Sequence, residues 1–215
     1  AELVREISKN TDIPWIRLLY CYPDKITDEL ISELRDNPKL VKYMDIPIQH
    51  ISDSVLKRMN RHGDRAEIES AIKRLRESVP GIVLRTTAMV GFPGESEEDF
   101  QETLQFIEKC DFAAMHVFPY SIRPGTPAAK MVQNPKAVKE ERARRASAVA
   151  EKMHREYLDG CVGKVYPVLF EQAKGELFSG HAPNYMEVLV QGGEELHNAV
   201  KSVRITRTDG QTLYG

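Results

Sequence analysis

The sequence predicts an α/β fold with a parallel sheet over its first two-thirds, followed by a small all-β part. Apolar, strand-like segments alternate with helix-like segments up to about residue 121. After a long charged helix, short strand-like pieces follow, separated by Gly and Asn or Asp turns. Strands that alternate with helices indicate parallel βα units, with a sheet buried on both faces. Closely spaced short strands with turns are typical of a small barrel or sandwich.

Four strands and four helices are expected in the first part. A residue that favours helix N-caps begins each helix, and apolar side chains recur at helical spacing along each one. The expected strands cover residues 15–22, 40–48, 82–90 and 113–121. The expected helices cover residues 27–36, 52–61 and 64–79, and a fourth begins at Ser96 with Asp99 in the capping-box position.

The character of the chain changes at Asn134. Residues 134–160 read as one helix, with seven Lys or Arg against four Glu between Lys136 and Glu156. The strand-like pieces after it begin at residues 164, 177 and 199. We therefore expect one domain over residues 1–160, ending in this basic helix, and a β domain over residues 161–215.

Composition predicts an ordinary globular protein rather than a disordered or fibrous one. Its 215 residues are 41% hydrophobic and 29% charged, with a formal net charge of -2, so global charge does not indicate nucleic acid. The sequence has no apolar run of membrane-spanning length and no signal-peptide pattern, which predicts a cytoplasmic location. Cys21, Cys110 and Cys161 are widely separated and form no metal-binding or cluster-binding spacing, so no metal ligands are predicted.

The segment "MVGFPGESEEDF" follows a predicted strand with a glycine-rich turn and then acidic residues. A phosphate-binding turn would offer a free helix N-terminus and a basic residue. Here Glu95, Glu97, Glu98 and Asp99 would already occupy the helix dipole and repel a phosphate. Gly91 and Gly94 allow unusual backbone angles, so the turn either lies against a flat organic ligand or is simply tight.

Working residues of parallel α/β folds lie at the carboxyl ends of the strands. Gln49 and His50 follow one predicted strand, and Tyr120 ends another. His50 has no evident catalytic partner nearby in sequence, which favours a structural histidine. Arg85 lies inside an apolar strand, where a guanidinium must be paired or must hold a carboxylate.

Four motifs together resemble the methylthiotransferase family of radical-SAM enzymes: "IPIQHISDSVLKRMNR", "LRTTAMVGFPGESEEDF", "HVFPYSIRPGTPAAKM" and the closing β segment. The resemblance covers essentially the whole chain. It implies that residues 1–160 form the later half of a partial (βα) radical-SAM barrel, and that residues 161–215 form a small all-β TRAM-like barrel.

The resemblance also implies cofactors: S-adenosyl-L-methionine and, in full-length members, two four-iron four-sulfur clusters. Carried over by position, Gln49, Arg85, Gly91, Phe92 and Tyr120 are expected around the S-adenosylmethionine site. The catalytic residues stay unassigned. A reducing partner such as a flavodoxin is implied, and no membrane.

The cysteine sets of the family are absent from this sequence. We therefore expect the chain alone to be an inactive fragment that binds neither cluster.

Two branches of the family are mixed in the motifs. The front resembles the branch that modifies an aspartate of a small-subunit ribosomal protein, and the back resembles the branch that acts on threonylcarbamoyladenosine in tRNA. Because the TRAM-like domain meets the target, the sequence favours tRNA, with the ribosomal protein as the alternative. Four arginines of the basic helix are the candidate nucleic-acid contacts: Arg142, Arg144, Arg145 and Arg155. A non-catalytic module that binds RNA or the ribosome is the rival from another class.

Overall fold

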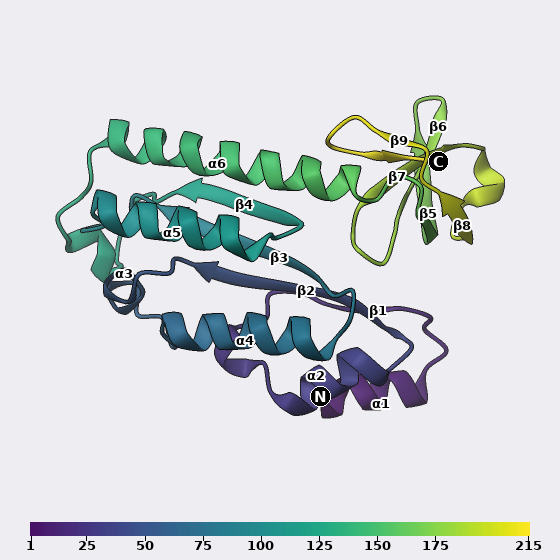
Figure 1. The fold of residues 1–215 in the computed structure, drawn as a ribbon, viewed down its shortest axis with the longest axis horizontal. Helices are drawn as coiled ribbons and strands as arrows, with labels where there is room; N and C mark the ends of the chain where they lie inside the picture. The colour runs from purple at the N-terminus through teal and green to yellow at the C-terminus, as the bar shows by residue number, and fades with distance from the viewer.

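The computed structural model describes residues 1–215 and contains two sheets (Figure 1). The first is parallel, with strand order β1-β2-β3-β4, and the second has the order β8-β5-β6-β7-β10-β9. The strands are β1 (Ile16–Leu18), β2 (Leu40–Gln49), β3 (Val83–Val90), β4 (Ala114–Pro119), β5 (Val165–Lys174), β6 (Leu177–His181), β7 (Glu187–Gln191), β8 (Val200–Arg204), β9 (Arg207–Thr208) and β10 (Leu213–Tyr214).

Most helices belong to the first part of the chain. The α-helices are α1 (Glu2–Asn10), α2 (Asp28–Asp36), α3 (Asp53–Arg58), α4 (Arg65–Ser78), α5 (Glu97–Cys110) and α6 (Lys136–Asp159). Short 3-10 turns occur at η1 (Pro23–Lys25), η2 (Pro127–Lys130) and η3 (Glu194–Leu196). The predicted α/β fold with a parallel sheet is therefore confirmed, and α1 is a helix that the sequence patterns had not indicated.

Local capping explains where the helices begin. The side chain of Thr27 accepts a hydrogen bond from Leu30 N, and that of Asp64 accepts one from Glu67 N. Ser96 and Asp99 form the predicted capping box of α5. Ser52 precedes α3 without a side-chain cap, and this helix ends at Arg58, earlier than predicted.

The two faces of the parallel sheet differ: one is buried as predicted, and the other is buried only in part. Side chains alternate along each strand, so Met44, Ile46 and Leu84 point to one face and enter the main hydrophobic core with the helices. The opposite face, called the inner face below, carries Asp45 and Arg85, which are register partners. The inner face is mixed: Tyr43 and Asp45 are buried on it, whereas Arg85 and Met89 are half-buried.

The second sheet is mixed. Strand β10 runs parallel to β7, whereas β5, β6, β7 and β8 pair antiparallel to one another. The pairings end at β8 on one side and β9 on the other, so hydrogen bonds do not join these two strands into a ring. Its core includes Phe170, Phe178 and Val188, and also Ala113 of the first part.

Helix α6 joins the two parts. It begins near the carboxyl ends of the parallel strands, packs along β4 and ends beside the second sheet (Figure 1). The predicted boundary at residues 160 and 161 falls between the end of α6 at Asp159 and the start of β5 at Val165. No helix is both long and apolar enough to cross a membrane.

Candidate functional site

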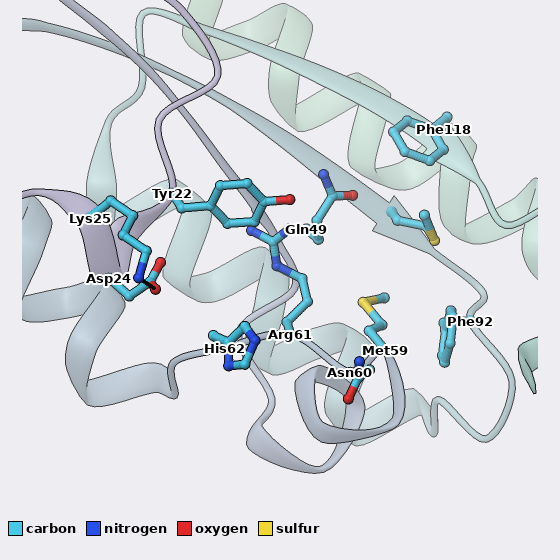
Figure 2. A pocket seen from close by; sticks show the side chains of 11 residues that line it. Tyr22, Asp24, Lys25, Gln49, Met59, Asn60, Arg61, His62, Phe92 and Phe118 are labelled. Atoms are coloured by element: carbon cyan, nitrogen blue, oxygen red, sulfur yellow. Dashed lines mark ion pairs between the residues drawn. The ribbon is translucent and has the colours of Figure 1, made fainter. Parts of the chain in front are cut away.

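A cavity of about 530 Å³ opens at the carboxyl ends of the parallel strands. We call it the strand-end pocket. Each strand, or the loop directly after it, contributes to its wall (Figure 2). The lining residues are Tyr22, Asp24, Lys25, Gln49, Met59, Asn60, Arg61, His62, Met89, Phe92 and Phe118. Its size lies within the usual range for small-molecule sites.

Gln49 ends β2 in an unusual backbone conformation. Its φ is +66°, in the left-handed region, and the pairing of β2 with β3 shifts register between Ile46 and Gln49. This break in the ladder allows the side chain to point into the pocket (Figure 2). Its Oε1 is buried and has no hydrogen-bond partner in the protein. A buried acceptor without a partner is costly, so a ligand that donates a hydrogen bond would fit here.

The glycine turn after β3 forms the next part of the wall. Gly91 and Gly94 have φ of +72° and +75°. A Cβ on Gly91 would lie 2.4 Å from the Cγ of Lys139, so α6 approaches this turn closely. The turn therefore needs glycine at position 91 for both space and backbone angle.

Glu95 holds the turn from inside. Its Oε2 accepts hydrogen bonds from Gly91 N at 2.7 Å and Phe92 N at 3.1 Å, and its side chain is fully buried. Arg142 of α6 donates from Nη1 to Glu95 Oε1 at 2.9 Å. This corrects part of the sequence argument, because Glu95 binds the turn's own N–H groups instead of lying at the helix dipole. Asp99 makes the dipole contact as predicted.

His50 lies behind the same turn. It is fully buried, and its Nδ1 accepts a hydrogen bond from Ser52 N at 3.0 Å. Its Nε2 lies 3.6 Å from Glu95 Oε2. The side chain does not line the strand-end pocket, which agrees with the predicted structural role.

Phe92 presents an aromatic face to the pocket, supported from behind. The Tyr120 ring meets it edge-on, with centroids 5.1 Å apart, and Asn134 donates to the Phe92 carbonyl at 2.7 Å. Met89 of β3 also lines the pocket, and Phe118 of β4 extends the apolar wall (Figure 2). Such a wall suits a flat heterocycle.

The opposite wall is charged. Lys25 forms an ion pair with Asp24 at 2.9 Å, while the Arg61 guanidinium lies 4.8 Å from the centre of the Tyr22 ring. Arg61 also donates to the Pro47 carbonyl at 2.6 Å. Burial lowers the pKa of Arg61, although the group stays protonated.

A second cavity, of about 450 Å³, lies between the inner face and the second sheet. We call it the inter-sheet cavity. Arg85 pairs there with Asp45, Nη1 to Oδ2, at 3.2 Å. Burial raises the pKa of the Asp45 carboxyl, and Arg85 partly opposes this.

Arg17 of β1 lies beside the inter-sheet cavity, against the rings of Tyr43 and Tyr185 that line it. It donates to the carbonyl of Ala182 at 3.0 Å and lies 4.2 Å from the centre of the Tyr185 ring. The Tyr185 ring in turn meets the Tyr43 ring of β2 edge-on. The loop between β6 and β7 is thereby attached to the inner face.

The five residues predicted to bind the cofactor do not all lie at one site. Gln49 and Phe92 line the strand-end pocket together. Gly91 and Tyr120 support Phe92 without lining the pocket. Arg85 lines the inter-sheet cavity instead, and four residues of strand place it roughly 13 Å from Met89. Its expected place at the cofactor site is therefore not supported by its position.

Sequence reasoning missed most of the polar pocket wall. Tyr22 belongs to a strand end that the sequence had marked, so its position could have been considered. Arg61 and His62 follow the short helix α3, and no periodic pattern indicates that they face the pocket. Met89 shares its face with Arg85 by simple alternation, a signal that could have been used.

The basic helix does not present its four arginines together. Arg142 is buried, with its side chain 6% exposed, and is paired with Glu95, so we correct its assignment as a nucleic-acid contact. Arg145 pairs with Glu97 and Arg144 with Glu141. Arg155 is exposed near the end of α6. Contacts to nucleic acid by these last three stay predictions.

The side chains of this protein form no cluster of metal ligands. No three His, Cys, Asp or Glu side chains lie close enough together to hold a metal ion. Cys110 and Cys161 are buried, and Cys21 is half-buried. These residues therefore do not provide the ligand set of an iron–sulfur cluster.

Comparison with known proteins assigns the fold. The family model described as Radical SAM superfamily matches residues 1–107. Coproporphyrinogen III oxidase (HemN) from Escherichia coli matches with a TM-score of 0.58 at 12% identity, covering 85% of this chain and 50% of that one. The Elp3 protein of Methanocaldococcus infernus matches with a TM-score of 0.50 at 17% identity, over 70% of this chain and 36% of that one. At such identities the likeness concerns the fold alone.

Curated relatives give a finer assignment. The ribosomal protein uS12 methylthiotransferase RimO of Alkaliphilus oremlandii is 44% identical, over 100% of this chain and 51% of that protein. The enzymes of the same name from Clostridium botulinum and Carboxydothermus hydrogenoformans are 46% and 47% identical, over 83% and 80% of this chain and 40% and 39% of theirs. The chain spans about half the length of the first relative and a smaller share of the other two. It belongs to the radical-SAM methylthiotransferase family.

The family implies S-adenosylmethionine and four-iron four-sulfur clusters as cofactors. Of these, S-adenosylmethionine fits the residues present. The strand-end pocket offers an aromatic wall, the unpartnered Oε1 of Gln49 and a charged end.

Proposed function

We propose that this chain provides the S-adenosylmethionine pocket of a methylthiotransferase that acts on ribosomal protein uS12. The cofactor supplies the radical chemistry when it is bound with a cluster. The residues of this chain bind it, orient it and exclude water from it. The observation that carries the proposal is the buried, unpartnered Oε1 of Gln49 beside the aromatic wall of the strand-end pocket.

Each wall has a distinct task in this proposal. Phe92, Met89 and Phe118 contact the adenine ring, and Gln49 accepts a hydrogen bond from a hydroxyl or amino group of the nucleoside. Glu95 holds Phe92 through the backbone N–H groups of the glycine turn. We also propose that residues 1–160 and 161–215 form two domains, because a separate sheet lies on each side of this boundary.

The proposed target replaces the tRNA favoured by the sequence motifs. The relatives that match at 44% to 47% identity are named for uS12, and none of these names mentions tRNA. The motifs resembling the tRNA branch lie at the closing β segment and around β4, and they had outweighed the front motifs. The buried state of Arg142 also removes one cation from the predicted nucleic-acid surface.

Calorimetry with S-adenosylmethionine tests the pocket. Gln49→Ala should weaken binding by about tenfold, because one hydrogen bond to the cofactor is lost. Gln101→Ala on the exposed side of α5, where Gln101 contacts only Glu97, is the matched control and should bind as the wild type does. Equal affinity in the Gln49 variant would remove that residue from the site.

Mass spectrometry tests the target. Cells that lack their own uS12 methylthiotransferase would receive the gene for this protein, and both uS12 and digested tRNA would be measured. A methylthio mass gain on uS12 is expected. A gain found on tRNA alone would overturn the proposed target.

A further inference from the structure

Two polar atoms of the inter-sheet cavity are buried and have no hydrogen-bond partner. They are the Oη of Tyr43 and the Oδ1 of Asp45, and both side chains line the cavity and are fully buried. The two residues lie two positions apart on β2, so they share the inner face at a spacing of about 7 Å. Buried polar groups without partners are costly, so a ligand that bonds to both would be stabilised here.

These two atoms need different groups on a ligand. Burial raises the pKa of Tyr43 to about 12, so its hydroxyl stays protonated and can donate to a ligand acceptor. Asp45 already accepts from Arg85 through Oδ2, which leaves Oδ1 free to accept from a ligand N–H group. A ligand edge with an N–H donor beside an acceptor fits this pair.

Two tyrosines of the cavity lining hold strained backbone conformations. Tyr20, in the loop after β1, has a φ of +58°, and Tyr185, between β6 and β7, has a φ of +67°. Bulky residues rarely adopt the left-handed region, and such strain concentrates at ligand sites. The Tyr185 ring already holds Arg17, whereas Tyr20 is 70% exposed and no other ring or cation packs on it. The face of the Tyr20 ring is therefore free for a flat heterocycle.

The charged side chains that line the cavity are paired. Arg85 pairs with Asp45 at 3.2 Å, and both carboxylate oxygens of Glu187 accept from Lys174 at 2.8 Å. Arg17, beside the cavity, has its guanidinium on two backbone carbonyls and two tyrosine rings. A ligand phosphate would find no unpaired cation in the lining, so a neutral ligand is favoured.

Two histidines add acceptors for hydroxyl groups. His154 donates from Nδ1 to the Ala113 carbonyl at 2.9 Å, and His181 donates from Nδ1 to Glu171 Oε2 at 2.8 Å. In the neutral ring Nδ1 therefore carries the proton, and Nε2 is left as an acceptor. Both side chains line the cavity, so the hydroxyls of a sugar find acceptors there.

We propose that the inter-sheet cavity binds a neutral nucleoside. The Asp45 carboxyl accepts from an N–H group on the edge of the base, the Tyr43 hydroxyl donates to the neighbouring acceptor, and the Tyr20 ring packs on the base. The cavity of about 450 Å³ has the size of a small-molecule site, and such sites often lie between domains. This site is separate from the strand-end pocket and goes beyond the proposed function.

Two kinds of base edge fit this arrangement. One is a ring N–H beside a carbonyl, as in inosine, and the other is an amino group beside a ring nitrogen, as in adenosine. Both present one donor next to one acceptor. The experiment therefore uses a matched pair of ligands for each kind of edge.

Calorimetry with these pairs tests the site. The pairs are inosine with 1-methylinosine, and adenosine with its N,N-dimethyl derivative, in which methylation removes the N–H donor. The proteins are the wild type, Tyr20→Asn, Tyr43→Phe and the double variant Arg85→Met with Asp45→Leu. Asparagine tolerates the left-handed angle at position 20, and the double variant removes the acceptor without leaving Arg85 unpaired. Gln101→Ala on the exposed side of α5 is the control.

The wild type and the control should prefer the unmethylated member of one pair by about tenfold to a hundredfold, the usual range for a hydrogen bond to a charged group. The double variant should lose that preference. Tyr43→Phe and Tyr20→Asn should weaken both members by about tenfold and keep the preference, because each removes a contact that methylation leaves in place. The pair that shows the preference identifies the edge of the base.

Four results would overturn the assignment. The wild type binds none of the four nucleosides, or it shows no preference within either pair. The preference survives in the double variant. The fourth result concerns Gln49→Ala, measured in parallel, which should keep the preference. Its loss in that variant would place the nucleoside in the strand-end pocket instead.

The proposed function fails independently of this site. S-adenosylmethionine should bind the double variant as it binds the wild type, because Asp45 and Arg85 do not line the strand-end pocket. If the wild type binds no S-adenosylmethionine while the nucleoside preference is intact, only the proposed function is overturned.

Thermal unfolding separates ligand binding from a structural role of the Tyr43 hydroxyl. Tyr43→Phe should have a Tm no lower than that of the wild type, because it removes a buried hydroxyl that has no partner. A Tm several degrees lower would show that the hydroxyl is already bonded in the free protein and would overturn the inference.

Discussion

The two ends of the inner face differ in how their polar groups are arranged. At the inter-sheet cavity, Arg85 pairs with Asp45, and Arg17 is held by backbone carbonyls and two aromatic rings. Arg17 Nε, Tyr43 Oη and Asp45 Oδ1 are nevertheless buried there without hydrogen-bond partners. At the strand-end pocket, Arg61 forms no ion pair although Asp24 attracts it at longer range, and Gln49 Oε1 has no partner beside an aromatic wall. A polar atom without a partner therefore indicates a ligand site only together with the size and apolar lining of the cavity around it.

The largest expected effect comes from breaking the Arg85–Asp45 ion pair at the inter-sheet cavity. Arg85→Met leaves Asp45 buried without its partner and should lower the free energy of unfolding by about 2 to 3 kcal/mol, below the full cost of breaking a buried pair, because Arg85 is partly exposed. Urea unfolding measures this. Replacing Asp45 as well, in Arg85→Met with Asp45→Leu, should recover most of the loss.

The same variant has a defined pH dependence. Burial raises the pKa of Asp45 above its ordinary value, and removing Arg85 raises it further. The folded state then favours the protonated carboxyl, so stability falls as pH rises from the ordinary pKa through the raised one. The loss should be large at neutral pH and small in acid. An equal loss at both would show that the destabilisation does not come from the Asp45 charge.

An intermediate effect is expected at the wall of the strand-end pocket. Gly91→Ala places a Cβ against Lys139 and forces a left-handed backbone angle on alanine, which should cost about 1 to 2 kcal/mol. Gly125→Ala is a matched control, since its φ is +85° but its Cβ meets nothing within 4 Å. Gly91→Ala should also weaken S-adenosylmethionine binding, because Phe92 moves with the turn. If the two variants lose the same stability and bind equally well, close packing by α6 does not shape the pocket.

The smallest expected effect is on stability alone, because Asp99 does not line the strand-end pocket. Asp99→Asn removes the charged half of the α5 capping box and should cost about 1 kcal/mol. Burial opposes ionisation of Asp99, but hydrogen bonds from Ser52, Ser54 and Ser96 outweigh it and lower the pKa. The stabilisation is therefore present above the ordinary pKa and is lost as pH falls through the lowered one.

Acid unfolding curves check this prediction. The Asn variant should lose less stability between neutral and acidic pH than the wild type does, while calorimetry shows unchanged cofactor affinity. If the two proteins lose the same stability between neutral and acidic pH, the role assigned to the Asp99 charge is contradicted.

The features that could be predicted from the sequence depend on residues close to one another along the chain. The Ser96 and Asp99 capping box, the Thr27 cap and the four strands follow from local side-chain chemistry and periodicity. Gln49 and Phe92 could be placed at the pocket because one ends a strand of the parallel sheet and the other lies in the turn directly after a strand. The cost of burying Arg85 correctly indicated a paired charge, although not where it lies.

The remaining features depend on contacts between distant segments. Arg142 looked like one more cation of a basic helix, and only the packing of α6 against the glycine turn buries it beside Glu95. The exposure of Arg61 to the pocket depends on where the chain turns after α3. The polar pair on the inner face could not be inferred from apolar runs, because Asp45 and Arg85 are a minority within them.

Helix α6 has a consequence for any partner of this protein. Its 24 residues correspond to about 36 Å, and it leads from the strand-end pocket to the second sheet beside the opposite ends of the strands. A target that contacts the second sheet at the inter-sheet cavity and also reaches the strand-end pocket can follow the shorter inner face instead, where roughly 13 Å separate Arg85 from Met89.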